Sequence, residues 1–252
     1  VSMLLGLFLT ALQLKWRREN FRTVVDMLLW GLPVALVFAR AAYVFLHREL
    51  YRDEFWAAFK IWQGGFSIYG ALAGMILTVF LYAMYNGLDP WYWLDLMVPA
   101  ILIGMVMNQL GNFVAQTVVG MPMPPDLPND HTLAEYIEFR YRPSGFENYE
   151  YFKPVALYHA ALQLIVFLFV CVAAYRRRYR EVVLAPAGML FLWSMTALAV
   201  IRFFCGFFYL TTDKTGGLHT GQLICIGAIV FLGRLLFQRW RRRARQGHRL
   251  FV

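Results

Sequence analysis

Seven apolar runs, most of them long enough to cross a lipid bilayer, constrain the fold of this chain more than any other feature of its sequence. They lie at about residues 2–14, 24–46, 67–85, 92–119, 155–175, 184–210 and 218–238. A helix needs about 20 apolar residues to cross hydrocarbon, and only a helix or a closed barrel satisfies its own backbone there. The composition, 60% hydrophobic and 15% charged, is typical of this class. The sequence therefore predicts an all-α, polytopic membrane protein with about seven transmembrane helices in a single domain, residues 1–252.

The first run is shorter than the others. It begins with Val1 and has no charged segment before it, so we do not expect a signal peptide. We interpret it as the inner half of a first, truncated transmembrane helix.

Basic residues lie close to the ends of particular runs and predict the orientation of the chain. Clusters follow the first, fifth and seventh runs, at residues 15–22, 176–180 and 234–249. With seven crossings all three clusters fall on one side, which the positive-inside rule makes cytoplasmic. The N-terminus is then outside, and a basic tail at 239–252 is cytoplasmic. Topology and contact with anionic lipid account for the net charge of +9, so we expect no nucleic-acid partner.

The longest connection, residues 121–153, is predicted to be periplasmic or extracellular. It is rich in proline, acidic residues and tyrosine, and its Pro-rich start excludes a helix before about His131. A loop of this length is usually functional or disordered. His131, Glu135 and Glu138 are candidate metal ligands in this loop, but no HExxH-like order supports a metal site, and ordinary surface polarity is the favoured interpretation. We expect no metal site and no cofactor.

The fourth run carries amides at membrane depth. Asn108, Asn112 and Gln116 are four residues apart, so on a helix they share one face. An unpaired amide in hydrocarbon is costly, so this face must meet protein, water or a polar headgroup. Gly111 and Gly120 would allow a ligand or another backbone to approach.

Two arginines are the strongest candidates for binding an anion. Arg40 and Arg202 lie deep in the second and sixth runs, with only Asp26 and Asp95 as acidic residues inside the runs. A phosphate ester would pair with a guanidinium in a bidentate manner. The alternative is that both arginines donate to backbone carbonyls or water.

A glycine-rich segment opens the third run. Gly70 and Gly74 have the spacing that lets helices pack closely, and Tyr69 lies in the same turn. Helix packing alone would explain the glycines. Tyr158 and His159 open the fifth run, where interfacial residues are common.

Five segments in this order resemble the prolipoprotein diacylglyceryl transferase family over nearly the whole chain: WQGGFSIYGALAG, NQLGNFVAQTVVG, KPVALYHAALQL, the segment around Arg202, and GLHTGQLICIGAIVFLG. The resemblance implies a multi-pass protein of the bacterial inner membrane. It implies transfer of diacylglyceryl from phosphatidylglycerol to the lipobox cysteine thiol of a preprolipoprotein, without a metal or soluble cofactor.

By this resemblance, Arg202 and Asn112 are catalytic candidates, with Tyr69 at a substituted catalytic position. The predicted lipid-binding residues are Arg202, Asn112, Gln109, Gly111, Gly120, Gly70 and Arg40. The chain also departs from the family at charged positions. The family has histidine at Tyr69, arginine at Gln109, and glutamate at Thr117, His159 and Gly206. A family tyrosine of the first helix would precede Val1.

These departures predict weak or lost transfer, because the thiol must lose a proton and the leaving glycerol phosphate needs cationic stabilisation. Tyrosine is a poor base near neutral pH, and an amide brings no charge. His159 is an alternative candidate for the base. The alternative function is a non-catalytic lipid-binding subunit that associates with other membrane proteins. A transporter or channel is disfavoured because residues 94–107 are too apolar for a polar pathway.

Overall fold

The computed structural model describes residues 2–52, 55–123, 134–179, 186–210, 214–215 and 218–249. The chain divides into two compact units, one formed by residues 11–96 and the other by residues 1–10 and 97–252. Helices α1 and α4 each contribute to both units. Each unit is described by itself.

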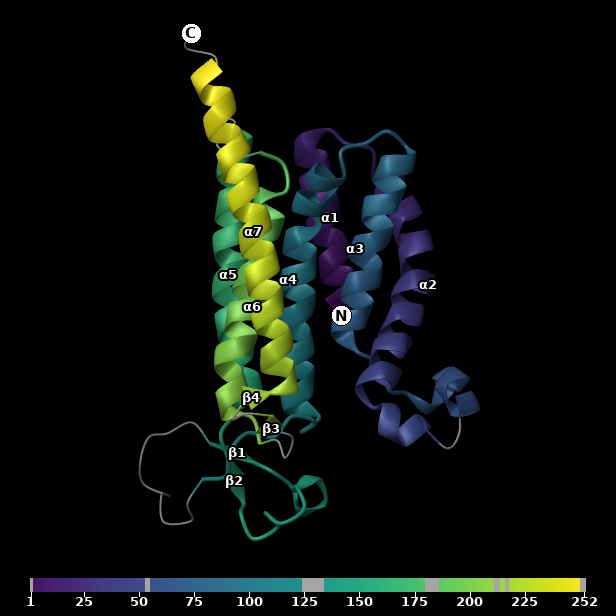
Figure 1. The fold of residues 1–252 in the computed structure, drawn as a ribbon, viewed down its shortest axis with the longest axis vertical. Coiled ribbons are helices and arrows are strands. Elements are labelled where there is room, and N and C mark those ends of the chain that lie inside the picture. Colours follow the sequence, from purple (N-terminus) through teal and green to yellow (C-terminus); the bar gives the residue numbers. More distant parts are fainter. Residues whose placement is uncertain are drawn as a thin grey trace. The chain divides into compact units, whose positions relative to one another are not determined.

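Seven α-helices are present in the part of the chain that the structure describes (Figure 1): α1 Ser2–Arg17, α2 Phe21–Leu46, α3 Ile68–Tyr85, α4 Pro90–Val114, α5 Val155–Tyr179, α6 Met189–Cys205 and α7 Thr220–Arg249. Six of them, α2 to α7, are long and apolar enough to cross a membrane. Two short antiparallel pairs complete the fold: β1 Glu135–Tyr136 with β2 Tyr151–Phe152, and β3 Lys214–Thr215 with β4 Leu218–His219. The chain is a polytopic helical membrane protein, as the sequence predicts.

In the unit of residues 11–96, glycines bring α2 and α3 together. A Cβ atom at Gly70 would lie 2.5 Å from the carbonyl oxygen of Phe38, and one at Gly74 would lie 2.9 Å from the Cα of Ala35. Both glycines are buried. The prediction of close helix packing is confirmed, and this contact explains why small residues recur at four-residue spacing on α3.

Replacing Gly70 with alanine is expected to destabilise this helix pair by about 1–3 kcal/mol, the usual cost of overpacking a close contact. The new methyl group would meet backbone, which cannot rotate away. Thermal unfolding in detergent measures the effect. Gly104→Ala is the matched control, because a Cβ there meets nothing within 4 Å. Equal melting temperatures for the two variants would contradict the close contact.

In the second unit, extended backbone joins the ends of α4, α5 and α6. Met121 donates its N–H to the carbonyl of Phe208 (3.0 Å), and Lys153 donates to the carbonyl of Met121 (3.0 Å). Isolated β-bridges pair Gly120 with Tyr209 and Pro122 with Phe152. Segments that follow α4 and α6 and precede α5 therefore lie side by side beneath the helices (Figure 1).

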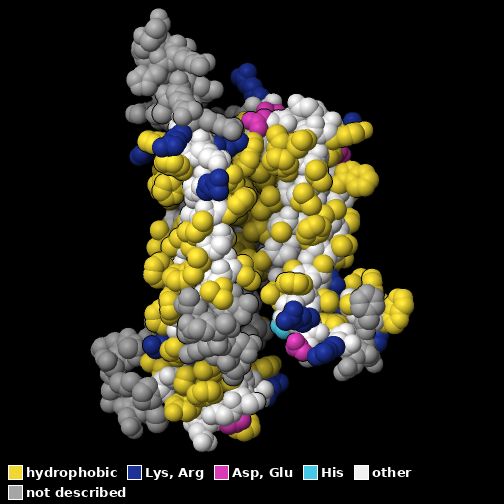
Figure 2. Space-filling model, in the orientation of Figure 1, with side chains coloured by type: hydrophobic (Ala, Val, Ile, Leu, Met, Phe, Trp, Pro, Cys, Tyr) yellow, Lys and Arg dark blue, Asp and Glu magenta, His cyan; other side chains and the backbone are white. Residues whose placement is uncertain are grey.

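The surface agrees with a membrane-spanning fold. Hydrophobic side chains cover most of the visible face along the helices, and basic side chains gather near helix ends (Figure 2). In the C-terminal half of α7, Arg239 donates to the carbonyl of Ala187, directly before α6. This part of α7 thus lies beside the start of α6, so in this unit the basic ends of α5 and α7 share one side. Placement of that side in the cytoplasm stays a prediction.

The structure corrects the predicted amide face of the fourth run. Helix α4 ends at Val114, and Gln116 lies beyond it with φ of +50°. Gln116 donates its N–H to the carbonyl of Phe113 (3.2 Å), and Thr117 donates to that of Asn112 (3.2 Å). These are the two hydrogen bonds of a Schellman ending, which usually has glycine at the left-handed position. Gln116 therefore does not share a helical face with Asn108 and Asn112.

Candidate functional site

A chain of polar side chains runs from the end of α4 to α5. The Thr117 hydroxyl donates to Oδ1 of Asn112 (3.2 Å), and Nδ2 of Asn112 donates to Oε1 of Gln109 (3.2 Å). Nε2 of Gln109 then lies 2.7 Å from Nδ1 of His159. By the resemblance of the sequence to the family, three of these four residues, Gln109, Thr117 and His159, stand at positions where charged residues are expected. The departures are therefore neighbours in space, and together they form a neutral hydrogen-bonded chain.

The hydrogen bonds of this chain indicate the tautomer of His159. The amide nitrogen of Gln109 can only donate hydrogen bonds. In this orientation of the amides, Nδ1 of His159 is therefore the acceptor. The neutral imidazole then carries its proton on Nε2. His159 is fully buried, and Nε2 has no hydrogen-bond partner among the described residues. In this arrangement the buried Nε2–H is a donor, not a base.

Arg202 lies beside this chain through Tyr209. The Tyr209 ring meets the His159 imidazole edge-on, with ring centroids 5.9 Å apart. The Arg202 guanidinium lies over the Tyr209 ring, with its Cζ 4.5 Å from the ring centroid. A cation over an aromatic ring is attracted by the ring quadrupole, more strongly where water is excluded. The structure thus brings together Asn112, Gln109 and Arg202, which the sequence predicted, around Tyr209, which it did not.

Glycines near this cluster have different roles. A Cβ at Gly120 would lie 2.1 Å from the carbonyl oxygen of Lys153, so Gly120 allows close approach of backbone. A Cβ at Gly111 meets nothing within 4 Å. At Gly206 a Cβ would lie 2.8 Å from Cγ of Gln222, and Gln222 donates to the carbonyl of Phe203 (3.1 Å). The Gln222 side chain therefore lies against position 206, where the resemblance implies a glutamate in the family.

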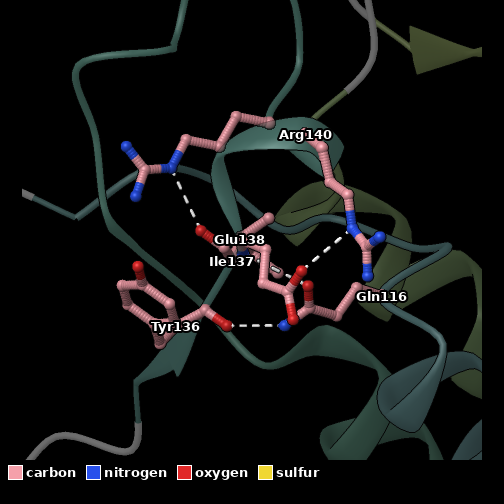
Figure 3. Close-up of polar contacts among 6 residues, drawn as sticks. Gln116, Tyr136, Ile137, Glu138 and Arg140 are labelled. Carbon is pink, nitrogen blue, oxygen red and sulfur yellow. Dashed lines mark hydrogen bonds and ion pairs between the residues drawn. The ribbon is translucent and has the colours of Figure 1, made fainter.

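Gln116 connects the end of α4 to the connection of residues 121–153, which is predicted to lie outside and is here called the outer loop. Its Nε2 donates to the carbonyl of Tyr136 (2.7 Å), and its Oε1 accepts from the N–H of Glu138 (3.2 Å). Figure 3 shows this amide facing the loop backbone, with the Glu138 carboxylate paired to Arg140 at 2.9 Å. The Gln116 amide thus donates to and accepts from the loop backbone, as a neighbouring β-strand would. These hydrogen bonds offset the conformational free energy that a non-glycine residue costs in the left-handed region.

Glu135, on β1, is a buried carboxylate in this loop. It is 5% exposed, and neither carboxylate oxygen has a hydrogen-bond partner among the described residues. Desolvation raises the pKa of Glu135 to about 7. Of the other two residues of the candidate metal site, Glu138 pairs with Arg140, and His131 lies outside the described residues.

The raised pKa of Glu135 predicts a pH effect on the loop. The folded state binds the proton more tightly than the unfolded state, so stability is highest at low pH. It falls as the pH rises from the usual glutamate value through about 7. Glu135→Gln is expected to remove this slope and to stabilise the loop by on the order of 1 kcal/mol above neutral pH. Hydrogen exchange of the loop amides at several pH values checks this. The exposed Glu138→Gln is the control, and an unchanged slope in Glu135→Gln would contradict the assignment.

Arg40 lies in the other unit, and the structure favours carbonyls as its partners. Its guanidinium donates to the backbone carbonyls of residues 57, 58, 60, 64 and 65. An arginine has five N–H donors, and all five are used. The sequence predicts a phosphate partner for Arg40 because few acidic residues lie inside the apolar runs. The structure corrects this prediction, since backbone carbonyl dipoles surround the Arg40 guanidinium.

Tyr69 and Gly70 also belong to the unit of residues 11–96. Gly70 is buried against α2, and this packing accounts for it without lipid contact. Tyr69 is 44% exposed in the first turn of α3. The catalytic role of Tyr69 and the lipid-binding role of Gly70 stay predictions.

The sequence does not single out Tyr209, which follows the end of α6 and is marked only by its place near Arg202. Glu135 is a candidate metal ligand or surface residue in the sequence, and the burial of its carboxylate is not predicted, because that burial depends on the pairing of β1 with β2.

Comparison with known proteins places the chain in a family. The family model described as prolipoprotein diacylglyceryl transferase matches residues 1–238. The phosphatidylglycerol–prolipoprotein diacylglyceryl transferase of Halalkalibacterium halodurans is 32% identical over 224 residues, covering 88% of this chain and 73% of that protein. The proteins of the same name from Listeria welshimeri and Listeria monocytogenes are 25% and 24% identical, each over 94% of this chain and 82% of their own length. The chain therefore belongs to the prolipoprotein diacylglyceryl transferase family.

Proposed function

We propose that this chain binds a phosphatidylglycerol-type anionic phospholipid in the bacterial inner membrane and that its transfer activity is weak or lost. The observation that carries this proposal is the neutral chain Thr117–Asn112–Gln109–His159, which lies next to Arg202 and Tyr209. A cation and several amide donors remain for a phosphate, while the charged groups that the family has at these positions are absent. Residues 1–252 act as one transmembrane domain in this proposal.

Lipid binding is supported by the chemistry of the donors. The Arg202 guanidinium can pair with a phosphate in a bidentate manner, and Asn112 can donate to the glycerol or phosphate oxygens. Gln109 and the open side of Gly111 belong to the same stretch of α4. The similar proteins of known name act on phosphatidylglycerol, and this lipid brings its own acyl chains to a membrane site.

Transfer would require more than binding. The lipobox thiol must lose its proton, its sulfur forms a bond to the glycerol carbon, and the bond from that carbon to the phosphate oxygen breaks. Glycerol phosphate leaves with the electron pair and takes up a proton. A base must accept the thiol proton, and a cation must stabilise the leaving group. Position 109 offers an amide in place of the family's arginine, so only part of this stabilisation remains.

His159 does not replace the missing base in the observed arrangement. Its Nδ1 accepts from Gln109, so Nε2 carries a proton. Tyr69 is the other candidate, and a phenol is a weaker general base near neutral pH than the family's histidine. Slow transfer follows from both facts.

The alternative function is a non-catalytic subunit that binds lipid within a larger membrane assembly. The same neutral chain supports it, because a binding subunit needs the phosphate donors but not the acid–base groups. Co-purification with other membrane proteins, together with bound lipid and no turnover, would favour this alternative. Isolation as a lone monomer that turns over would exclude it.

The test combines lipid identification with an activity assay on one preparation. The protein is purified in mild detergent, its bound lipid is identified by mass spectrometry, and transfer to a lipobox peptide is measured in phosphatidylglycerol vesicles. The Halalkalibacterium halodurans relative is the positive control. Bound phosphatidylglycerol with transfer at least about 100-fold slower, a loss of about 2.7 kcal/mol in transition-state stabilisation, supports the proposal. Equal rates, or no anionic lipid, would overturn it.

A further inference from the structure

An irregular segment between α2 and α3 needs partners for its backbone. Residues 56–66, here called the aromatic segment, include the end of the 3₁₀ helix Phe55–Phe59, the 3₁₀ helix Ile61–Gln63 and the glycines 64 and 65. This backbone has no α-helical hydrogen-bond ladder. Carbonyl groups without partners cannot lie at membrane depth without a cost of several kcal/mol each.

Arg40 supplies those partners from inside α2. Its Nε donates to Ala58 (2.8 Å), one Nη to Gly64 and Gly65 (3.1 Å for Gly65), and the other to Ala57 (2.9 Å) and Lys60 (3.3 Å). Arg40 is 6% exposed. A side chain with five donors in one plane thus binds five carbonyls of an irregular backbone, which a lysine could not do.

The outer surface of the same segment is aromatic. Trp56, Phe59 and Trp62 are 77%, 61% and 79% exposed. This surface continues the apolar end of α2, where Phe45 and Leu46 are 74% and 50% exposed. The neighbouring 3₁₀ helix Arg48–Tyr51 adds an exposed pair of opposite charges, Arg48 and Glu49, 3.8 Å apart.

We propose that the aromatic segment lies in the headgroup boundary of the lipid bilayer, at the end of α2, and that Arg40 holds its backbone there. Tryptophan prefers this boundary, because its ring is apolar and its N–H needs a polar partner. The occupant of the surface is lipid, since the surface continues that of a helix that crosses the bilayer and lies next to charged residues suited to headgroups. The carbonyls bound by Arg40 need neither water nor a partner protein. This inference is independent of lipid binding at Arg202.

The position of the two tryptophans can be measured directly. The full chain is reconstituted in vesicles of phosphatidylcholine and phosphatidylglycerol whose acyl chains carry bromine either near the glycerol or near the bilayer centre. The difference in fluorescence between the unaltered protein and the double variant Trp56→Phe/Trp62→Phe gives the signal of these two tryptophans. We expect shallow bromines to quench it at least about twofold more than deep bromines. Trp30, 68% exposed in the middle of α2, should show the reverse in Trp30→Phe. Quenching only by aqueous iodide, or no lipid quenching because a protein covers the pair, would overturn the proposal.

The role of Arg40 is tested in the same vesicles. In Arg40→Gln, shallow quenching of the tryptophan pair is expected to fall about twofold while iodide quenching rises, since a freed backbone seeks water. Arg48→Gln, at an arginine side chain that is 79% exposed, should leave both unchanged. A folded Arg40→Gln protein with unaltered quenching would refute the role of Arg40. If that variant does not fold, Arg40→Lys, which keeps the charge but not the planar fork, gives the same comparison.

Discussion

Replacing Arg202 with alanine is expected to remove bound anionic phospholipid from the purified protein. Charge-assisted hydrogen bonds contribute about 1.5–3 kcal/mol each, so loss of the guanidinium should lower lipid content at sub-saturating lipid by about 10-fold or more. The remaining donors, Asn112 and Gln109, are neutral and already share hydrogen bonds. Mass spectrometry of lipid per mole of protein measures the change.

Two further variants make the result specific to the phosphate contact. Arg140→Ala removes an exposed arginine of the outer loop that pairs with Glu138, and its lipid content should match that of the unaltered protein. Arg202→Lys keeps the charge and loses the bidentate geometry, so an intermediate content is expected. A folded Arg202→Ala protein with full lipid content would remove the basis for placing the headgroup at Arg202.

The helices themselves could be predicted from hydropathy because each must satisfy its backbone within one segment. The runs at 24–46 and 67–85 correspond to α2, Phe21–Leu46, and α3, Ile68–Tyr85. Gly70 and Gly74 also indicated close packing before any partner was known. The local sequence pattern is sufficient here, because residues four apart on one helix share a face, and glycine at both positions gives that face small side chains.

The end of α4 could not be predicted in the same way. The apolar run continues to about residue 119, whereas the helix ends at Val114. A helix that ends in a left-handed residue is usually marked by glycine, and Gln116 carries no such mark. Its conformation depends on hydrogen bonds to Tyr136 and Glu138, about 20 residues away in the chain.

The partners of buried polar and charged side chains could not be predicted from the sequence either. Counting acidic residues within the runs left phosphate and carbonyls as alternatives for Arg40, and only the tertiary structure shows five carbonyls around it. Gln109 and His159 were likewise noted as separate departures. Their contact joins α4 to α5 across 50 residues of sequence, which no pattern in a single sequence reveals.

Restoring the family's residues at this contact, with arginine at position 109 and glutamate at position 159, is expected to show coupling between the two positions. Gln109→Arg alone places a buried guanidinium beside a neutral imidazole, and His159→Glu alone places a buried carboxylate beside an amide. Gln109→Arg is expected to destabilise the protein by about 3–5 kcal/mol, because an unpaired buried charge is left. His159→Glu should cost less, because Arg202 lies near enough to position 159 to interact with a carboxylate there. In the double variant the two charges can pair, so its loss should be smaller than the sum of the single losses by about 3 kcal/mol. Thermal or denaturant unfolding of the four proteins gives this coupling.

A matched pair shows whether the coupling belongs to this contact. Gln163, one turn further along α5 and 2% exposed, offers a carboxylate in Gln163→Glu that should couple more weakly to Gln109→Arg, because it is not in hydrogen-bond contact with position 109. If the double variant at 109 and 159 loses as much as the two single variants together, the two positions are independent. If the double variant shows this coupling energy and also transfers diacylglyceryl faster per bound lipid, the neutral pair Gln109 and His159 limits transfer. Coupling without faster transfer would instead locate the limiting change elsewhere, with Tyr69 as the next position to restore, because a cation at 109 supports the leaving group but supplies no base for the thiol.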